Sequence, residues 1–242
     1  MRNPGRGHVG FWIWLSVVLI KPTVAALFRT RWRGRDNLPR SGGAIVVSNH
    51  VSQADFTTLA VWVWDSGRIP RFLIKHSLFS VFAIGGLLRG ARQIPVVRGS
   101  VMARQSLDEA VASINRGECV CIYPEGTVTR DPEFWPMEPR TGVARLALTT
   151  DAPVVPVAQW GPQVLLDVDR RTFRPFRRPE AFCQAGPPLD LSAYRGRPLT
   201  AELLHEVTGV IMGAVRDQLA EVRGEPAPLE FFRRPPARRE AS

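Results

Sequence analysis

The sequence predicts an α/β fold: a mixed, largely parallel sheet flanked by helices, with an N-terminal membrane-associated helical segment. Two observations support this prediction. From Ala44 onward, short apolar runs rich in β-branched residues alternate with longer segments whose apolar residues recur at helical spacing. Before that point, residues 11–28 form an apolar run with arginines on both sides, which is typical of a helix at a membrane surface.

The N-terminal apolar run is interrupted at its midpoint by Lys21 and Pro22. Neither half reaches the roughly 20 apolar residues that a straight membrane span needs. The flanking arginines suit anionic headgroups, so we expect residues 1–35 to form a helix pair or kinked helix lying in one leaflet. The protein would then be peripheral or monotopic at the cytoplasmic face of the cell membrane. A cleaved signal peptide and a single membrane span are the alternatives.

Residues 36–223 are expected to form one domain, because a chain of 242 residues is long enough for one sizeable core. Buried strands are predicted over residues 44–48, 71–75, 94–97, 119–123, 154–158 and 182–185. One helix is predicted to start with Ser52 as its cap and Asp55 in its first turn, and further helices are predicted over residues 77–84, 102–115, 141–150 and 200–223. Gly85 and Gly86 are expected to close the second of these helices. Residues 224–242, rich in proline and arginine, are expected to be a disordered basic tail.

The chain is strongly basic, with 32 lysines and arginines against 22 acidic residues and a net charge of +10. This balance predicts contact with a polyanion: nucleic acid, an anionic membrane surface or a phosphorylated substrate. The arginines are not gathered on one recognition helix and no zinc or RNA-binding motif occurs, so a nucleic-acid-binding module is the weaker alternative.

Three cysteines occur, Cys119, Cys121 and Cys183. Their number is odd and their spacing is not that of metal ligands, so we interpret them as reduced core residues of a cytosol-facing protein. No metal or redox cofactor is implied.

His50 and Asp55 form the first motif with chemical meaning, in the stretch Asn49-His-Val-Ser-Gln-Ala-Asp55. The histidine follows a predicted strand and the aspartate lies in the first turn of the next predicted helix, so the two side chains can face each other. A carboxylate in this position fixes the imidazole tautomer and stabilises the imidazolium, which suits removal of a proton from an alcohol. No Gly-x-Ser-x-Gly sequence is present and no histidine lies near Cys119 or Cys121. Direct attack by a substrate hydroxyl is therefore simpler than a covalent acyl-enzyme.

The second motif is Tyr123-Pro-Glu-Gly-Thr127, which follows another predicted strand. The backbone amides of Gly126 and Thr127 can face an anion, and Glu125 can hold a basic group or a substrate hydroxyl. Because ligands gather beyond the C-terminal ends of parallel strands, we expect both motifs to share one crevice.

Four blocks in this order resemble the glycerolipid acyltransferase family, which includes the lysophosphatidic acid acyltransferases. The family has an Asn-His-x4-Asp block, a Gly-rich block ending in Arg, a Phe-Pro-Glu-Gly-Thr block and a Val-x-Pro-Val strand. Here they are Asn49–Asp55, Gly90–Arg98, Tyr123–Thr127 and Val154–Val157. Lys75 resembles part of the stretch before the second block, and Arg140-Thr-Gly142 is similar to the Lys-x-Gly after the third. The resemblance covers roughly residues 40–160.

The resemblance implies that His50 is the base and that Asp55 orients it. It assigns Arg98, with Glu125, Gly126 and Thr127, to the site for the acceptor phosphate. Val128 stands where many members have arginine, and whether Arg130 covers that role is open. Lys75, Arg130 and Arg140 complete the set of candidate substrate-binding residues.

The activity implied is that of an O-acyltransferase. It would move a fatty acyl group from acyl-CoA or acyl carrier protein to 1-acylglycerol-3-phosphate, making phosphatidic acid at an anionic membrane surface. The same fold acting on glycerol-3-phosphate, a lysophospholipid or a glycolipid is the alternative.

Overall fold

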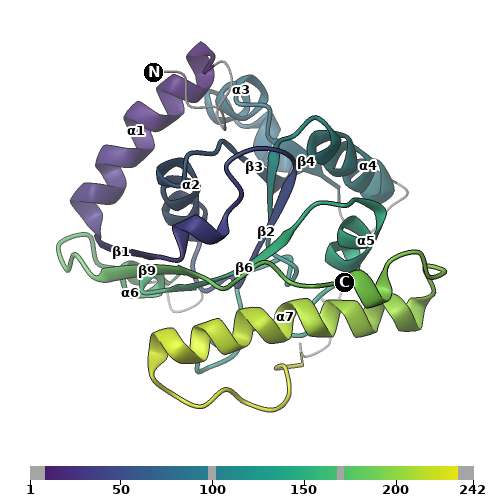
Figure 1. Ribbon diagram of the computed structural model, residues 1–242. Helices are drawn as coiled ribbons and strands as arrows, with labels where there is room; N and C mark the ends of the chain where they lie inside the picture. Colours follow the sequence, from purple (N-terminus) through teal and green to yellow (C-terminus); the bar gives the residue numbers. More distant parts are fainter. Residues whose placement is uncertain (1–8, 98–101, 168–171, 234–242) are drawn as a thin grey trace, which may run out of the picture.

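The computed structural model describes residues 9–97, 102–167 and 172–233, and its centre is a seven-stranded sheet (Figure 1). The strands lie in the order β1-β9-β6-β2-β5-β3-β4. Their bounds are β1 Arg29–Arg33, β2 Ala44–Ser48, β3 Pro70–Lys75, β4 Ile94–Val96, β5 Cys119–Ile122, β6 Val154–Trp160 and β9 Glu180–Ala185. Only the β6–β9 pair is antiparallel among these neighbours, so the sheet is mixed and largely parallel, as predicted.

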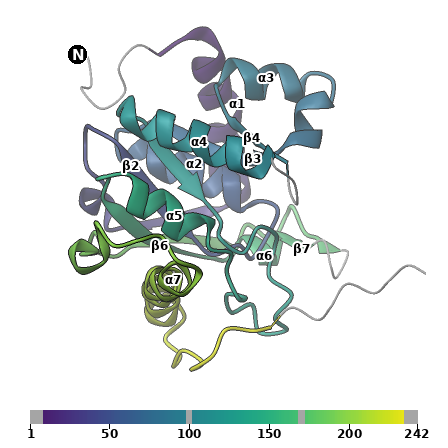
Figure 2. The same ribbon diagram turned by 90° about the vertical axis from the view of Figure 1, so that its right-hand side faces the viewer.

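Helices cover both faces of the sheet (Figures 1 and 2). The α-helices are α1 Phe11–Leu27, α2 Asp55–Asp65, α3 Ile84–Gly90, α4 Met102–Asn115, α5 Gly142–Thr149, α6 Pro162–Leu165 and α7 Ala201–Arg223. Short 3-10 helices are η1 Arg35–Asn37, η2 His76–Ser80 and η3 Ser192–Tyr194. A separate two-stranded antiparallel sheet consists of β7 Leu166–Asp167 and β8 Thr172–Phe173.

Alternate residues of the central strands enter two different cores. In β2, Ile45 and Val47 face α4, α5 and α7, whereas Ala44 and Val46 face α2. All five residues of β2 are buried, as expected for a parallel strand covered on both faces. The three cysteines are free and buried, in agreement with the sequence prediction.

The parallel strands β2 and β5 bring the two motifs to one edge of the sheet. They pair from Ala44 opposite Cys119 to Val47 opposite Ile122, so both end at the same level. His50 lies two residues beyond β2, and Tyr123 directly follows β5. This register explains why motifs far apart in the sequence meet.

The N-terminal segment is a single helix, so the helix-pair alternative of the prediction is wrong. One continuous α-helix, α1, runs from Phe11 to Leu27 with Pro22 inside it. The lysine before this proline is accommodated by an ion pair, since Lys21 Nζ lies 2.7 Å from Asp65 Oδ1 at the end of α2. In the described part of the chain, no helix is both long enough and apolar enough to cross a bilayer.

The boundary expected at residue 35 also differs, because β1 lies before it and pairs in parallel with β9 from Arg29 opposite Glu180. The prediction that Gly85 and Gly86 close a helix over residues 77–84 is wrong, since α3 begins at Ile84 and contains both glycines. Gly85 is needed for close packing instead: a Cβ there would meet the backbone carbonyl oxygen of Phe79.

The first part of the expected tail lies against the domain. Phe232 forms a bridge with Met137, and its carbonyl oxygen accepts from the backbone N–H of Glu138 at 3.0 Å. Arg216 of α7 donates from Nη1 to the carbonyl oxygen of Leu229 at 2.9 Å. These bonds give residues 224–233 a defined path, and residues 234–242 lie outside the described ranges.

Candidate active site

His50 and Asp55 form a close pair at the C-terminal edge of the sheet. His50 Nδ1 lies 2.9 Å from Asp55 Oδ2, and the exposed fractions of the two side chains are 14% and 0%. The same carboxylate oxygen accepts from the backbone N–H groups of Val51 at 2.6 Å and Ser52 at 2.8 Å. The loop between the two residues is therefore wrapped around the carboxylate, which fixes the imidazole in one orientation.

The environment of Asp55 acts on its protonation in two directions. Burial raises the pKa of the carboxyl group above its ordinary value, and it outweighs the hydrogen bonds from His50, Ser52 and Val51 that favour the ionised form. Oδ1 is buried without a hydrogen-bond partner, so Oδ2 carries all of the bonds to this group.

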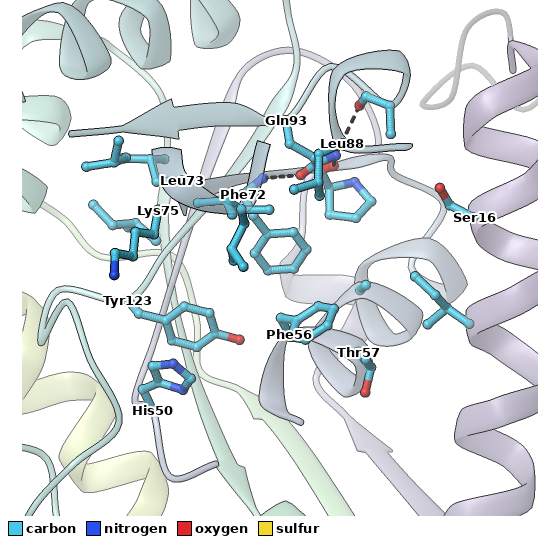
Figure 3. A pocket seen from close by; sticks show the side chains of 18 of the residues that line it. Ser16, His50, Phe56, Thr57, Phe72, Leu73, Lys75, Leu88, Gln93 and Tyr123 are labelled. Carbon is cyan, nitrogen blue, oxygen red and sulfur yellow. Dashed lines mark hydrogen bonds between the residues drawn. The ribbon is translucent and has the colours of Figure 1, made fainter. Parts of the chain in front are cut away.

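A second contact, with an aromatic ring, covers one face of the imidazole. The ring of Tyr123 stacks on that of His50, with centroids 4.4 Å apart and planes inclined by 23°. Figure 3 shows the two rings face to face at the wall of a cavity. Gln159 Nε2 donates to the Tyr123 hydroxyl at 3.0 Å, and burial raises the pKa of the Tyr123 phenol well above its usual range.

Gln159 is the centre of a buried polar network behind this stack. Its side-chain Oε1 accepts from Thr58 at 2.9 Å, and its Nε2 also donates to Ser48 at 3.2 Å. The Asn49 side chain bonds to both backbone groups of Gln159. It donates from Nδ2 to the Gln159 carbonyl oxygen at 3.0 Å, and its Oδ1 accepts from the Gln159 N–H at 2.8 Å. The asparagine before the histidine thus ties the loop beyond β2 to the end of β6.

Glu125 holds the backbone of His50. Its Oε1 accepts from the His50 N–H at 2.8 Å, and its Oε2 accepts from the Met137 N–H at 2.9 Å. Thr129 N–H donates to the His50 carbonyl oxygen at 2.7 Å, so both main-chain groups of His50 are fixed. Glu125 is only 1% exposed, and both of its carboxylate oxygens face backbone N–H groups, so its contact with substrate stays a prediction.

The imidazole opens onto an apolar cavity of about 710 Å³. Apolar side chains of α1, α2, α3 and β3 line most of it, among them Ile13, Val17, Ala60, Val61, Leu73 and Leu87. His50 and Tyr123 form part of the wall, and Lys75 lies on the same side of the cavity as these two rings (Figure 3).

Two further predicted residues line this cavity, Gly126 and Arg140. Gly126 has a φ of +70°, and a Cβ there would lie 3.4 Å from Arg140 Nε. Glycine therefore allows the exposed guanidinium to approach the turn closely. The backbone N–H of Arg140 donates to the Pro124 carbonyl oxygen at 3.0 Å, which fixes the arginine beside the second motif.

The remaining predicted residues are not brought to the cavity wall or are not described. Thr127 is half-buried and Arg130 is exposed, and neither lines the cavity. The backbone N–H of Arg130 bonds to Met137 Sδ at 3.2 Å. Arg98 lies outside the described residues, so its role stays a prediction.

No group of three or more His, Cys, Asp or Glu residues within the described ranges is placed to hold a metal ion.

A family model described as Acyltransferase matches residues 29–160, more than half of the chain. The chain belongs to the acyltransferase family. The matched region begins at the first residue of β1 and ends at the last residue of β6, so it contains both motifs and excludes α1 and α7. The family resemblance inferred from the motifs is confirmed.

Two proteins are similar in sequence to about half of this chain. A 1-acyl-sn-glycerol-3-phosphate acyltransferase of Bacillus subtilis (strain 168) is 30% identical over 131 residues, which cover 53% of this chain and 61% of that protein. An uncharacterized protein of Mycobacterium leprae (strain TN) is 29% identical over 152 residues, covering 57% of this chain and only 39% of that protein. The match thus spans about three fifths of the length of the first protein and two fifths of the length of the second.

The fold has a solved counterpart in the 1-acyl-sn-glycerophosphate (LPA) acyltransferase PlsC from Thermotoga maritima. The TM-score is 0.60 with 20% sequence identity, and the match covers 90% of both chains. This likeness confirms the predicted fold class of a mixed, largely parallel sheet flanked by helices.

Proposed function

We propose that the protein is a membrane-associated O-acyltransferase that acylates the free hydroxyl of a 1-acylglycerol-3-phosphate. The acyl donor would be a thioester, acyl-CoA or acyl carrier protein, and the product phosphatidic acid. The observation that carries this proposal is the His50–Asp55 pair at the wall of a large apolar cavity that Lys75 and Arg140 also line. An apolar space suits a fatty acyl chain, and two cationic side chains suit a phosphate.

His50 would act as the general base. Asp55 accepts from Nδ1, which assigns the proton to that nitrogen and leaves Nε2 to accept a proton from the acceptor hydroxyl. As that proton moves to Nε2, the hydroxyl oxygen attacks the thioester carbonyl carbon. The resulting tetrahedral intermediate expels the thiolate, which takes the proton from the imidazolium and leaves as a thiol. The ester is formed without a covalent acyl-enzyme.

The surroundings of His50 favour the imidazolium that forms during this step. Asp55 lies against Nδ1, and the electron-rich face of Tyr123 lies against the ring. Both partners are fixed before substrate arrives, one by the loop amides and the other by Gln159. Such preorganisation stabilises charge where it develops without reorganising the site.

Membrane association would begin at α1. One side of this helix places Ile13, Val17 and Ile20 on the cavity, while Phe11, Trp14 and Leu19 are more than half exposed. A helix that is apolar around its circumference needs a second apolar medium outside the protein. The inner face of the cell membrane fits the free buried cysteines.

Acyl transfer to a panel of acceptors from acyl-CoA and acyl carrier protein, with products identified by mass spectrometry, tests the proposal. The panel includes 1-acylglycerol-3-phosphate, glycerol-3-phosphate, a lysophospholipid and a glycolipid. We expect phosphatidic acid to form fastest, and the His50→Ala enzyme to form almost none. If another acceptor is acylated faster, the protein is an acyltransferase with a different substrate from the one proposed. If the His50→Ala enzyme is active, His50 is not the general base.

A further inference from the structure

An apolar tip projects from the segment that joins η2 to α3. Leu78 and Val81 are each 43% exposed, Ile84 is 49% exposed and Phe82 is 97% exposed. Ala83 adopts a φ of +63°, a left-handed conformation uncommon for a residue with a side chain. Isolated apolar residues are ordinary on a protein surface, but four within seven residues form a patch that marks an interaction site.

This tip lies beside α1 and at the edge of the cavity. Figures 1 and 2 show α3 next to α1, at the end of the molecule away from α7. The contact is close, because a Cβ on Gly90 at the end of α3 would meet the indole ring of Trp12. Leu78 and Ile84 are exposed and also line the cavity, so an apolar surface continues from the outside of the protein to its interior.

The charges around the tip match an anionic surface. No aspartate or glutamate occurs in residues 66–107, and none occurs in residues 1–35, although the whole chain has 22. Lys75 lies on one side of the tip and Arg89 on the other, and neither forms an ion pair with any described residue. Apolar side chains between unpaired cations are typical of segments that enter the headgroup region of a bilayer.

We propose that residues 78–84 are a second membrane-inserting element, which enters an anionic leaflet beside α1. The cavity then opens directly into the lipid between these two elements. An acyl chain can pass from the leaflet to His50 without its apolar surface crossing water, which lowers the free energy of entry. This inference rests on the proposed function in one respect, namely that the cavity receives acyl chains.

A fluorescent label tests the insertion itself, without any assay of activity. Because all three native cysteines are buried, the Phe82→Cys variant can be labelled with nitrobenzoxadiazole at residue 82. The matched control is Leu229→Cys, since Leu229 is 96% exposed and follows α7 on the far side of the molecule (Figure 2). The vesicles contain phosphatidylcholine and phosphatidylglycerol, with or without spin labels on the acyl chains.

We expect the dye at residue 82 to shift its emission to shorter wavelength and to be quenched by the spin labels, and the dye at residue 229 to do neither. A dye at residue 82 that stays in water while the protein sediments with the vesicles would overturn the proposal.

Charge substitutions give an independent measurement. The Phe82 side chain is 97% exposed, so replacing it with aspartate puts a carboxylate at the tip and should leave the fold unaffected. We expect its partition coefficient onto the same vesicles to fall by roughly tenfold or more, from the loss of one inserted aromatic side chain and added repulsion. Leu229→Asp should change it by less than about twofold. Equal partitioning of both variants and the wild type would count against insertion.

Activity separates this inference from the proposed function. With a short-chain acceptor and donor in monomeric solution, Phe82→Asp should turn over at the wild-type rate, while turnover of long-chain substrate in vesicles falls. If the wild type transfers no acyl group at all, the proposed function fails, and the labelling result still decides whether the tip inserts.

Discussion

Glu125 accepts a hydrogen bond from the backbone N–H of His50 at 2.8 Å, across a separation of 75 residues in the sequence. This bond joins the end of β2 to the turn after β5, and the second oxygen of the same carboxylate reaches the backbone of Met137. The second motif therefore positions the first. A carboxylate is suited to this task because it has two acceptor oxygens and no donor.

Replacing Glu125 with glutamine should lower kcat by roughly tenfold or more, because the amide N–H₂ faces a backbone donor and the His50 loop shifts. The free energy of unfolding should fall by about 1–3 kcal/mol for the same reason. The KM for the acceptor should change by less than about twofold, because the substitution removes no contact that binds the acceptor in the ground state. Steady-state kinetics with urea unfolding measure all three quantities. A large rise in acceptor KM at unchanged kcat would instead return Glu125 to the substrate site.

Removing the imidazole tests the base directly. His50→Ala should lower kcat by roughly 10²–10⁴-fold, the usual effect of losing a positioned general base. Its melting temperature should stay close to that of the wild type, because the bonds that hold this loop go to the His50 backbone and to Asp55 rather than to the imidazole alone. Calorimetry of the purified variant is the control for folding. A wild-type rate in a folded variant would exclude His50 as the base.

Asp55→Asn should reduce both activity and stability. The amide oxygen can replace Oδ2, but the imidazolium loses its carboxylate and kcat should fall by roughly 10²-fold or more. The amide nitrogen would occupy the position of Oδ1, which is buried without a partner, and this should cost about 1–3 kcal/mol of unfolding free energy. Kinetics and urea unfolding on the same preparation distinguish this double effect from the purely catalytic effect at His50. An unchanged unfolding free energy would show that water reaches this position.

The stack on His50 separates the contributions of the Tyr123 ring and hydroxyl. Tyr123→Phe keeps the ring against the imidazole, so kcat should stay within about threefold of wild type, while loss of the bond to Gln159 costs roughly 1 kcal/mol of stability. Tyr123→Leu removes the aromatic face that lies against the imidazolium and should lower kcat more strongly. Equal kcat values in the two variants would show that the stack is only packing.

The sheet could be predicted well from the sequence because its central strands are short, mostly apolar and rich in β-branched residues. Strands β2, β5 and β6 begin at the predicted residues. The edge strand β1 was not predicted, since its alternating arginines resemble the flank of a membrane segment, and only pairing with β9 at residues 180–185 makes it a strand. The pattern of residues 29–33 gives no information about this distant partner strand, so the strand could not be predicted from it.

The site was predicted in part for a similar reason. His50 and Asp55 are neighbours in sequence, so their pairing could be inferred from a strand end followed by a helix start. Gln159 was missed and Asn49 was given no role, although Asn49 begins the first block and Gln159 lies two residues past the fourth. Their partners are backbone groups and buried hydroxyls of distant segments. A crevice shared by the two motifs was predicted, but its apolar part was missed, since that part is lined by α1, α2 and α3 together.

Reducing the volume of the cavity should change the length of acyl chain that the enzyme accepts. Ala60 lies on α2 and lines the cavity, so Ala60→Phe places a phenyl ring in space that an acyl chain would occupy. We expect kcat/KM for long chains to fall by roughly tenfold or more relative to short chains, since each excluded methylene forfeits about 0.8 kcal/mol of burial. Ala201→Phe, at the exposed start of α7, is the size-matched control. The same chain-length profile in both variants would place the acyl chain elsewhere.

Stability should depend on acid pH through Glu118, which joins the start of β5 to β3. Its Oε1 accepts from Arg71 Nη2 at 2.9 Å and its Oε2 accepts from Ser113 at 2.8 Å, with the carboxylate side chain 15% exposed. Burial alone would raise the pKa of Glu118, but the Ser113 hydrogen bond and the charge of Arg71 outweigh it, so the pKa lies below the ordinary 4.5. The fold therefore favours the ionised form more than the unfolded chain does.

A carboxyl group with a lowered pKa stabilises the fold fully above its unfolded value of 4.5, and this contribution is lost as the pH falls through the lower folded-state value. Glu118→Gln should thus lower the free energy of unfolding by about 1–3 kcal/mol at pH 7. Below the folded-state pKa the difference from wild type should shrink, because the wild-type carboxyl is then neutral too. Urea unfolding at pH 7 and at a series of values below 4.5 measures this.

Glu109→Gln, which breaks a surface pair with Arg116, is the control and should change stability by less than about 1 kcal/mol at neutral pH. A Glu118 effect of the same size throughout the acid range would assign its contribution to packing rather than to charge.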